Sequence, residues 1–438
     1  MWGGIPLNRK PFFPAVPVYH KEAMAPPRRI VRLSEYHTYE RMLNVLNAVR
    51  DVAPNLKPLP LIQGFSIPLT EPVSPSVPEL FKQPDLVVED DPVVRLSFIP
   101  GMLPVFFASP TYSERKPGIP YGVRWIGADK VWKHSKGAHV KIAVIDTGAD
   151  YSHPDLANRL GLGINLVQPL LPPYDDNGHG THITGTIVAS NRKDGIVGVA
   201  PEAVVYPVKS FDHKGTAYVS DIIRGLEWCI DNKMDIINMS FGMHRHSPAL
   251  YEAIMRAHRS GIIIVASSGN DGKQASVDYP ARFRQTVSVG ASNLKHAVAA
   301  FSNRSPDIDI YAPGEKVKST WPHGQYRKMS GTSMATAHVS GTIALMLSAC
   351  GKMPVHRIKK ILQTTGRPLV SGHHQEREIN AYRAVRKAMA LQAAAKRKGK
   401  KKSGANGAQN AQSSSKRRRR QTKPRQKTRP KLRKHRNT

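Results

Sequence analysis

The sequence has few cysteines, no long apolar run and few acidic residues, and each shortage narrows the class of protein. Two cysteines, Cys229 and Cys350, cannot form a disulfide framework, and both lie in apolar stretches typical of buried thiols. No stretch approaches the roughly 18 apolar residues of a membrane span, and the first ten residues lack the apolar core of a secretory signal. We therefore expect a cytoplasmic protein without a transmembrane segment, with an extracellular location as the alternative.

Acidic residues are outnumbered by basic ones, 32 to 65, and the excess is concentrated at the C-terminal end. Residues 396–438 hold 19 Lys or Arg and no Asp or Glu. Their Lys, Arg, Gln, Ser and Gly content predicts disorder, and the absence of aromatic residues argues against stacking on single-stranded bases. Such a tail is either a solvated polycation or a binding segment for an anionic polymer, such as nucleic acid or a cell-wall polymer, or for an acidic protein.

The first part of the chain predicts a small α+β unit. Residues 1–27 are Pro-rich and aperiodic, as expected of a loosely packed arm. Short strands are predicted at 30–33, 65–69 and 86–88, with a helix after Ser34 and another over 75–81.

From residue 119 onward, strand and helix patterns alternate. Near-continuous apolar runs, typical of strands buried on both faces, occur at 140–145, 204–208, 236–239, 262–265 and 287–289. Helices are predicted from Ser220, from the Ser247-Pro248 cap, over 354–363 and over 384–395. This alternation predicts an α/β domain with a parallel sheet between helices, whose functional groups collect at the carboxyl ends of the strands.

Three short motifs follow one another in a fixed order, and each contains one part of a nucleophilic triad. Asp146 ends an apolar run as part of Asp-Thr-Gly, His179 lies in Asn-Gly-His-Gly-Thr-His, and Ser333 lies in Gly-Thr-Ser-Met-Ala. Alone, each residue has an ordinary structural explanation as a turn residue, a structural histidine or a loop serine. The order Asp, His, Ser over two long gaps distinguishes this set from the other common triad orders.

The chemistry of these residue types is complementary. A serine hydroxyl becomes a nucleophile when a base takes its proton, so His179 is the expected base and Asp146 orients the imidazole. Asn270 follows the apolar run 262–265 and is the candidate side-chain donor to the oxyanion, beside the amide of Ser333.

The motifs resemble those of the subtilisin family of serine proteases. Further matching segments are His153-Pro154-Asp155-Leu156, Gly198-Val199-Ala200-Pro201, Asn238-Met239-Ser240-Phe241-Gly242 and Tyr279-Pro280-Ala281. The resemblance implies a three-layer α/β catalytic domain over 119–392 and an inhibitor-type propeptide over 28–95. The remaining segments are then the arm 1–27, a linker with the processing site over 96–118, and the basic tail 393–438.

The resemblance also implies how a protein substrate is held. Ser240, Phe241 and Gly242 would pair with the backbone of the substrate, and Gly215, Thr216, Ala217 and Tyr218 would face them across the cleft. Backbone pairing supplies affinity without requiring a particular sequence, which suits a serine endopeptidase acting on proteins. The propeptide would lie with its end in this cleft until it is cut, and Tyr112, Arg115 and Lys116 are candidate cut points.

Two positions depart from the family pattern. Asp278 precedes the Tyr-Pro pair, where many relatives have a small residue at the floor of the primary specificity pocket. A carboxylate there would favour Lys or Arg before the cut, with Asp175 and Asp176 as possible contributors, whereas the alternative is an Asp278 that points to solvent or caps a turn.

The second departure concerns calcium. Relatives often bind calcium through the carboxylate that matches Asp155 and the loop that matches 190–196, but Arg192 stands where an Asn ligand is common. We therefore expect no metal or cofactor in the chemistry and only a doubtful structural calcium site. The competing function is a catalytically inactive protease fold that binds anionic polymers through its tail.

Overall fold

The computed structural model describes residues 27–34, 44–45, 47, 56–69, 82, 85–96, 118–190, 194–370, 376–395 and 397. The chain divides into two compact units, residues 1–92 and 93–438. The arm 1–27 apart from its last residue, the helix predicted over 75–81, the three candidate cut points and the tail beyond residue 397 lie outside the described residues.

The first unit contains an antiparallel sheet in the order β2-β3-β1-β4. Its elements are β1 (Arg28–Leu33), β2 (Lys57–Leu59), the short 3-10 helix η1 (Pro60–Ile62), β3 (Gly64–Pro68) and β4 (Leu86–Asp90). Val31, Val45, Phe65 and Ile67 form a buried apolar cluster in it. The three strands predicted in this part of the chain are therefore confirmed, and Asn44, Val45 and Asn47 are helical within the helix predicted after Ser34.

The second unit has a central parallel sheet. Within the described residues its strand order is β17-β18-β14-β13-β12-β10-β6-β8-β7, and β17 and β18 are its one antiparallel pair. These strands are β6 (Lys141–Asp146), β7 (Ile164–Asn165), β8 (Val204–Lys209), β10 (Ile236–Met239), β12 (Ile263–Ser267), β13 (Thr286–Ser292), β14 (Ile310–Pro313), β17 (Arg367–Pro368) and β18 (Arg377–Glu378). All five predicted parallel strands are present, and the register of β6 with β8 and β10 buries both faces of their apolar runs.

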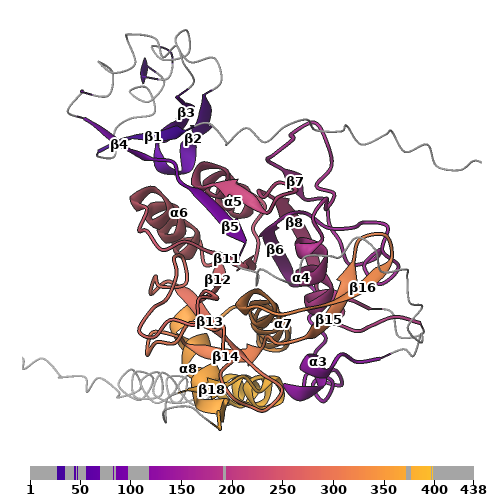
Figure 1. Cartoon of the computed structure of the whole chain (residues 1–438). Coiled ribbons are helices and arrows are strands. Elements are labelled where there is room, and N and C mark those ends of the chain that lie inside the picture. The colour runs from indigo at the N-terminus through magenta and orange to yellow at the C-terminus, as the bar shows by residue number, and fades with distance from the viewer. Residues whose placement is uncertain are drawn as a thin grey trace, which may run out of the picture. The chain divides into compact units, whose positions relative to one another are not determined.

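Helices cover both faces of the sheet, as the α/β three-layer prediction requires (Figure 1). The helices are α3 (Tyr121–Trp125), α4 (His179–Val188), α5 (Val219–Asp231), α6 (Pro248–Arg259), α7 (Thr332–Cys350) and α8 (Val355–Thr365), and residues 381–395 are also helical. Helix α7 packs against α4 and the central strands, while α5 packs against α6. The cap prediction for α6 is confirmed, because the Ser247 hydroxyl accepts a hydrogen bond from Leu250 N at 3.2 Å.

Helix α7 is buried along most of its length, with small residues where it passes its neighbours. It is long and apolar enough to meet a membrane-span criterion, but 83% of its apolar window is buried inside the protein, as expected of a core helix. Gly341 illustrates the packing, since a Cβ there would lie 2.6 Å from the Val199 side chain. Neither cysteine forms a disulfide; Cys229 is buried as predicted, whereas Cys350 is only half-buried.

Two smaller sheets flank the central one. The hairpin β15 (Val317–Trp321) and β16 (Gln325–Met329) precedes α7, and an antiparallel sheet joins β11 (Phe241–Gly242), β5 (Val93–Leu96) and β9 (Thr216–Tyr218) in that order. The sequence gives no periodic signal for β5, which is four residues long and follows a proline.

Candidate active site

The structure brings Asp146 and His179 into direct contact. Asp146 is the last residue of β6 and His179 the first residue of α4, so a strand end meets a helix start. His179 Nδ1 lies 2.8 and 2.9 Å from the two carboxylate oxygens of Asp146, and both side chains are almost fully buried. With Nδ1 facing the carboxylate, the other ring nitrogen, Nε2, is the one that can accept a proton.

Ser333 lies in the first turn of α7 and is fully buried. Its hydroxyl donates a 2.8 Å hydrogen bond to the carbonyl of Ser240, the residue immediately before β11. His179 Nε2 is buried and has no hydrogen-bond partner among the described residues. The hydroxyl is therefore turned toward the carbonyl that precedes β11, and within the described residues no hydrogen bond joins it to His179.

Asn270 is oriented by the residue before Ser333. Its carbonyl oxygen, Oδ1, accepts 2.8 Å hydrogen bonds from both the backbone N–H and the hydroxyl of Thr332. Because Oδ1 faces Thr332, the Nδ2 group is the donor end of the Asn270 side chain, beside the start of α7. The arrangement brings together an amide donor, the amino end of a 19-residue helix and the Ser333 hydroxyl.

Asp175 has a structural role that the sequence did not indicate. Asp175 accepts hydrogen bonds from the Thr147 hydroxyl at 2.8 Å, from Gly178 N at 2.8 Å and from Thr181 N at 2.8 Å. One carboxylate thus ties the residue after Asp146 to the first turn of α4. The predicted contribution of Asp175 to specificity does not fit these contacts, because both of its carboxylate oxygens already accept hydrogen bonds at the start of α4.

Asp176 is engaged elsewhere as well. The ammonium of Lys209, whose side chain is buried, lies 2.6 Å from a carboxylate oxygen of Asp176 and donates to the carbonyl of Thr147 at 2.7 Å. Lys209 ends β8 beside Asp146, so its charge is paired and hydrogen-bonded behind the catalytic loop. The buried cation is a feature that the sequence pattern did not reveal.

Close packing explains the glycines of the His motif. Gly178 has φ +107°, and a Cβ there would meet the Trp321 ring at 2.2 Å.

On the next turn, burial and the neighbouring His179 lower the pKa of His182 to about 3. The His182 imidazole is consequently neutral, and Nε2 donates toward the carbonyls of Val317 and Arg327 on the β15–β16 hairpin.

The predicted substrate strands lie opposite each other with a segment of the chain between them. β5 pairs with β11 through Leu96 opposite Phe241, and with β9 through Val94 opposite Ala217. The backbone N–H of Leu96 donates to the carbonyl of Gly215 at 3.0 Å. Phe241 and Gly242 therefore border β5 on one side and Gly215, Ala217 and Tyr218 on the other, while Ser240 contacts the Ser333 hydroxyl.

Asp278 is buried rather than pointing to solvent. A Cβ on Gly242 would lie 2.7 Å from its carboxylate, and one on Gly269 would lie 2.5 Å from it, so the carboxylate lies against both backbone walls. Burial raises the pKa of Asp278, while the nearby His244 acts in the opposite direction. The position between the β11 edge and the segment leading to Asn270 agrees with a pocket floor.

The calcium position retains one suitable ligand atom. Asp155 is fully buried, and its Oδ2 accepts from Ile196 N at 2.8 Å and from the Tyr326 hydroxyl at 2.9 Å. Its Oδ1 has no partner among the described residues and faces Gly195. This oxygen fits a cation, whereas Arg192 lies outside the described residues.

The comparisons with known proteins agree with this geometry. Residues 137–412 match the model of the Subtilase family. The chain is 42% identical to subtilisin from Bacillus pumilus over 263 residues, which cover 58% of this chain and 94% of that protein. It is 45% identical to subtilisin E from Bacillus subtilis over 242 residues, or 54% of this chain, and spans only 62% of that relative. It is also 40% identical to the major intracellular serine protease of Bacillus subtilis over 52% of this chain and 75% of that protein.

Proposed function

Because this chain belongs to the subtilase family of serine proteases, we propose that it is a serine endopeptidase that hydrolyses peptide bonds of proteins. The observation that carries the proposal is the buried Asp146–His179 pair, whose Nε2 has no hydrogen-bond partner among the described residues and can accept a proton. A catalytically inactive scaffold does not explain why this imidazole and its carboxylate are both retained.

The reaction proceeds in two half-reactions. Ser333 Oγ leaves the Ser240 carbonyl and attacks the carbonyl carbon of the substrate while His179 Nε2 takes its proton. Asp146 stabilises the resulting imidazolium, and the Ser333 amide and Asn270 Nδ2 stabilise the oxyanion. Collapse breaks the C–N bond, His179 returns the proton to the leaving amine, and an acyl-enzyme remains. Water, deprotonated by His179, then hydrolyses that ester and regenerates Ser333.

Substrate binds as a central strand between β11 and β9. The seating of β5 in the groove supports this role, because its backbone pairs with both edges as an extended peptide would. The same observation supports synthesis as a restrained precursor in which residues 28–95 form the propeptide. The strand ends at Leu96, where the predicted linker with the processing site begins.

Lys or Arg before the cleaved bond is the preferred side chain in this proposal. Its basis is the buried carboxylate of Asp278 against the walls formed by Gly242 and Gly269. A long cationic side chain that reaches this carboxylate would form a charge-assisted hydrogen bond with it. Anionic polymers bound by the basic tail, and the compartment in which the protein works, stay predictions.

No cofactor takes part in the proposed chemistry. Calcium, if bound, would be held by Asp155 and the loop 190–196, and it would stabilise that loop without entering the reaction. Every proton transfer is assigned to His179.

The test is covalent labelling with a fluorophosphonate. We expect the purified full chain to be labelled at Ser333 and the Ser333→Ala variant to remain unlabelled, with Ser330→Ala as the matched serine control. Each variant removes one serine hydroxyl, at the start of α7 or just before it, so equal labelling of both would overturn the proposal. A second measurement is cleavage of a denatured protein substrate, which we expect only from the forms that the fluorophosphonate labels.

A further inference from the structure

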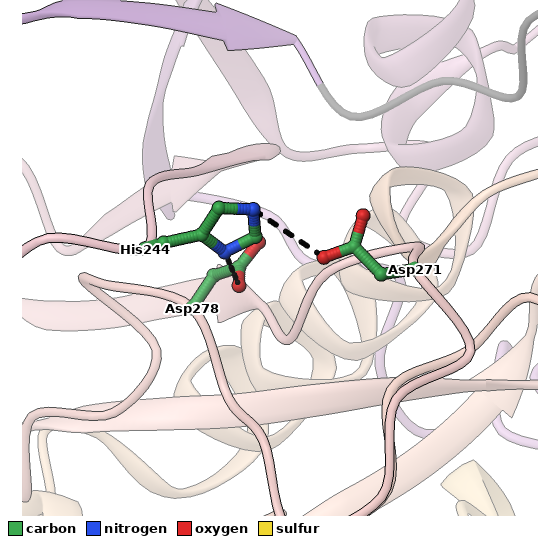
Figure 2. A group of neighbouring side chains, drawn as sticks. All are labelled: His244, Asp271 and Asp278. Carbon is green, nitrogen blue, oxygen red and sulfur yellow. Dashed lines mark hydrogen bonds and ion pairs between the residues drawn. The ribbon is translucent and has the colours of Figure 1, made fainter.

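Three side chains from three loops meet at the floor of the specificity pocket. His244 follows β11, Asp271 follows the oxyanion candidate Asn270, and Asp278 precedes Tyr279 (Figure 2). His244 Nδ1 lies 3.1 Å from Asp278 Oδ1, and His244 Nε2 lies 3.5 Å from Asp271 Oδ2. Both ring nitrogens thus face a carboxylate, an arrangement in which a protonated imidazole forms an ion pair with each.

We propose that His244 is a specificity-determining residue, an internal cation that competes with a basic substrate side chain for the Asp278 carboxylate. The proposal rests on the proposed function, in which Asp278 recognises Lys or Arg. It adds that preference for these residues depends on whether the imidazole occupies the carboxylate.

The exposures of the two partners decide which of them moves. The His244 side chain is 61% exposed, whereas that of Asp278 is 7% exposed and fixed between backbone walls. An incoming ammonium or guanidinium can therefore displace the imidazole toward solvent without moving the carboxylate. The cost of displacement is the ion pair, and for a partly exposed pair that cost is about 1 kcal/mol or less, a factor of about five in affinity.

The charges around the imidazole set how the preference changes with pH. The charged groups facing it are Asp271 and Asp278, and Lys273 Nζ lies 3.3 Å from Asp271 Oδ2. Lys273 therefore balances Asp271, and Asp278 is the carboxylate that depends on His244 for a countercharge. A protonated imidazole at this position competes with the substrate for Asp278 and a neutral one does not, so the basic preference is expected to increase with pH.

The experiment compares matched peptides that differ only in the residue before the cut, Lys against Leu, in the mature enzyme from pH 6 to 8.5. Buffers free of divalent metals ensure that no ion bound by the three side chains takes the place of the imidazole. The measured quantity is the ratio of kcat/KM for the two peptides, normalised by fluorophosphonate titration. The variants are His244→Ala and His244→Gln, and His356→Ala on the exposed face of α8 is the control.

We expect the wild-type Lys-to-Leu ratio to rise about fivefold from pH 6 to 8.5. At each pH, the ratio in His244→Ala and His244→Gln should exceed the wild-type ratio, by up to about fivefold, while His356→Ala follows wild type. The forms are compared at the same pH because burial raises the pKa of Asp278 itself, and protonation of that carboxyl lowers the ratio in all of them. A His244→Ala ratio equal to wild type at pH 6, or lower, overturns the proposal. Failure of the proposed function gives a different result, because the Lys-to-Leu ratio would then be insensitive to Asp278→Asn, or Ser333 would not be labelled.

Discussion

The proposed catalytic centre and the proposed specificity pocket are built in opposite ways. Asp146, His179 and Ser333 come from a strand end and two helix starts, and all three are at most 2% exposed. The pocket floor is formed by loop residues, of which His244 is mostly exposed and Asp271 is 37% exposed. In the proposed function the chemistry therefore lies on secondary-structure elements and the selectivity on loops, in which a buried carboxylate, Asp278, has an exposed partner, His244.

This difference teaches where a substitution is tolerated. Around His179, Asp175 and closely packed glycines constrain the geometry, so most changes there disturb the reaction itself. In the pocket, a single residue such as Asp278 changes which charge the site presents, without altering the elements that hold the triad. The predictions below test this separation, from the largest expected effect to the smallest.

The largest effect is expected for Asp146→Asn. An asparagine amide can donate to Nδ1 and so fix the tautomer in which Nε2 carries the proton, and such a change lowers kcat about 10⁴-fold in a triad of this kind. Steady-state kinetics with a peptide anilide measures it, and Asp231→Asn at the exposed end of α5 is the control. A loss below about tenfold would mean that the buried pair does not govern the reaction.

A smaller loss is expected for Asn270→Ala, about 10²–10³ in kcat with KM nearly unchanged, because one oxyanion donor is removed. Asn270→Asp separates donation from positioning, since a carboxylate can still accept from Thr332 N but cannot donate to an oxyanion. We expect kcat to fall in both variants. Full kcat in Asn270→Asp would show that Asn270 acts only by holding Thr332.

The sequence was most informative where chemistry constrains several residues at once. Strands 141–146 and 263–267 were predictable because burial on both faces requires continuous apolar runs, and the polar residues after them, Asp146 and Asn270, could then be placed at one edge. The order and context of the three motifs made the triad recognisable before its geometry was known.

Features that depend on tertiary contacts were not predictable. Strand β5 exists because two other strands provide its partners, and nothing in Val93–Leu96 alone requires it. His244 is separated from Asp278 by 34 residues, and no local pattern links an exposed histidine to a pocket floor. Lys209 is a further case, since only the fold shows that this lysine is buried and paired with Asp176.

In the pocket, Asp278→Asn should reduce the Lys-to-Leu ratio of kcat/KM by about 10- to 100-fold, the worth of a hydrogen bond to a charged group. Asp271→Asn should reduce it by no more than about fivefold, because Lys273 already neutralises that more exposed carboxylate. Competition between the two peptides in one reaction measures both ratios. A wild-type enzyme that prefers Leu, or an unchanged ratio in Asp278→Asn, would contradict the proposed preference.

The smallest effect is expected from removal of calcium, which would bind at Asp155. Ile196 N and the Tyr326 hydroxyl already satisfy one oxygen of Asp155. The sequence also has a cation, Arg192, in the predicted calcium loop, where an Asn ligand is common among relatives. We therefore expect a chelator to lower the thermal midpoint by less than about 2 °C, under 1 kcal/mol for a domain of this size. Arg192→Asn, measured with and without added calcium, is the sharper comparison, because it removes the opposing charge and should make the midpoint calcium-dependent through the free Oδ1. A fall of about 10 °C or more in wild type would show instead that an ion stabilises the loop next to α4, and that the rigidity of the catalytic centre depends on it.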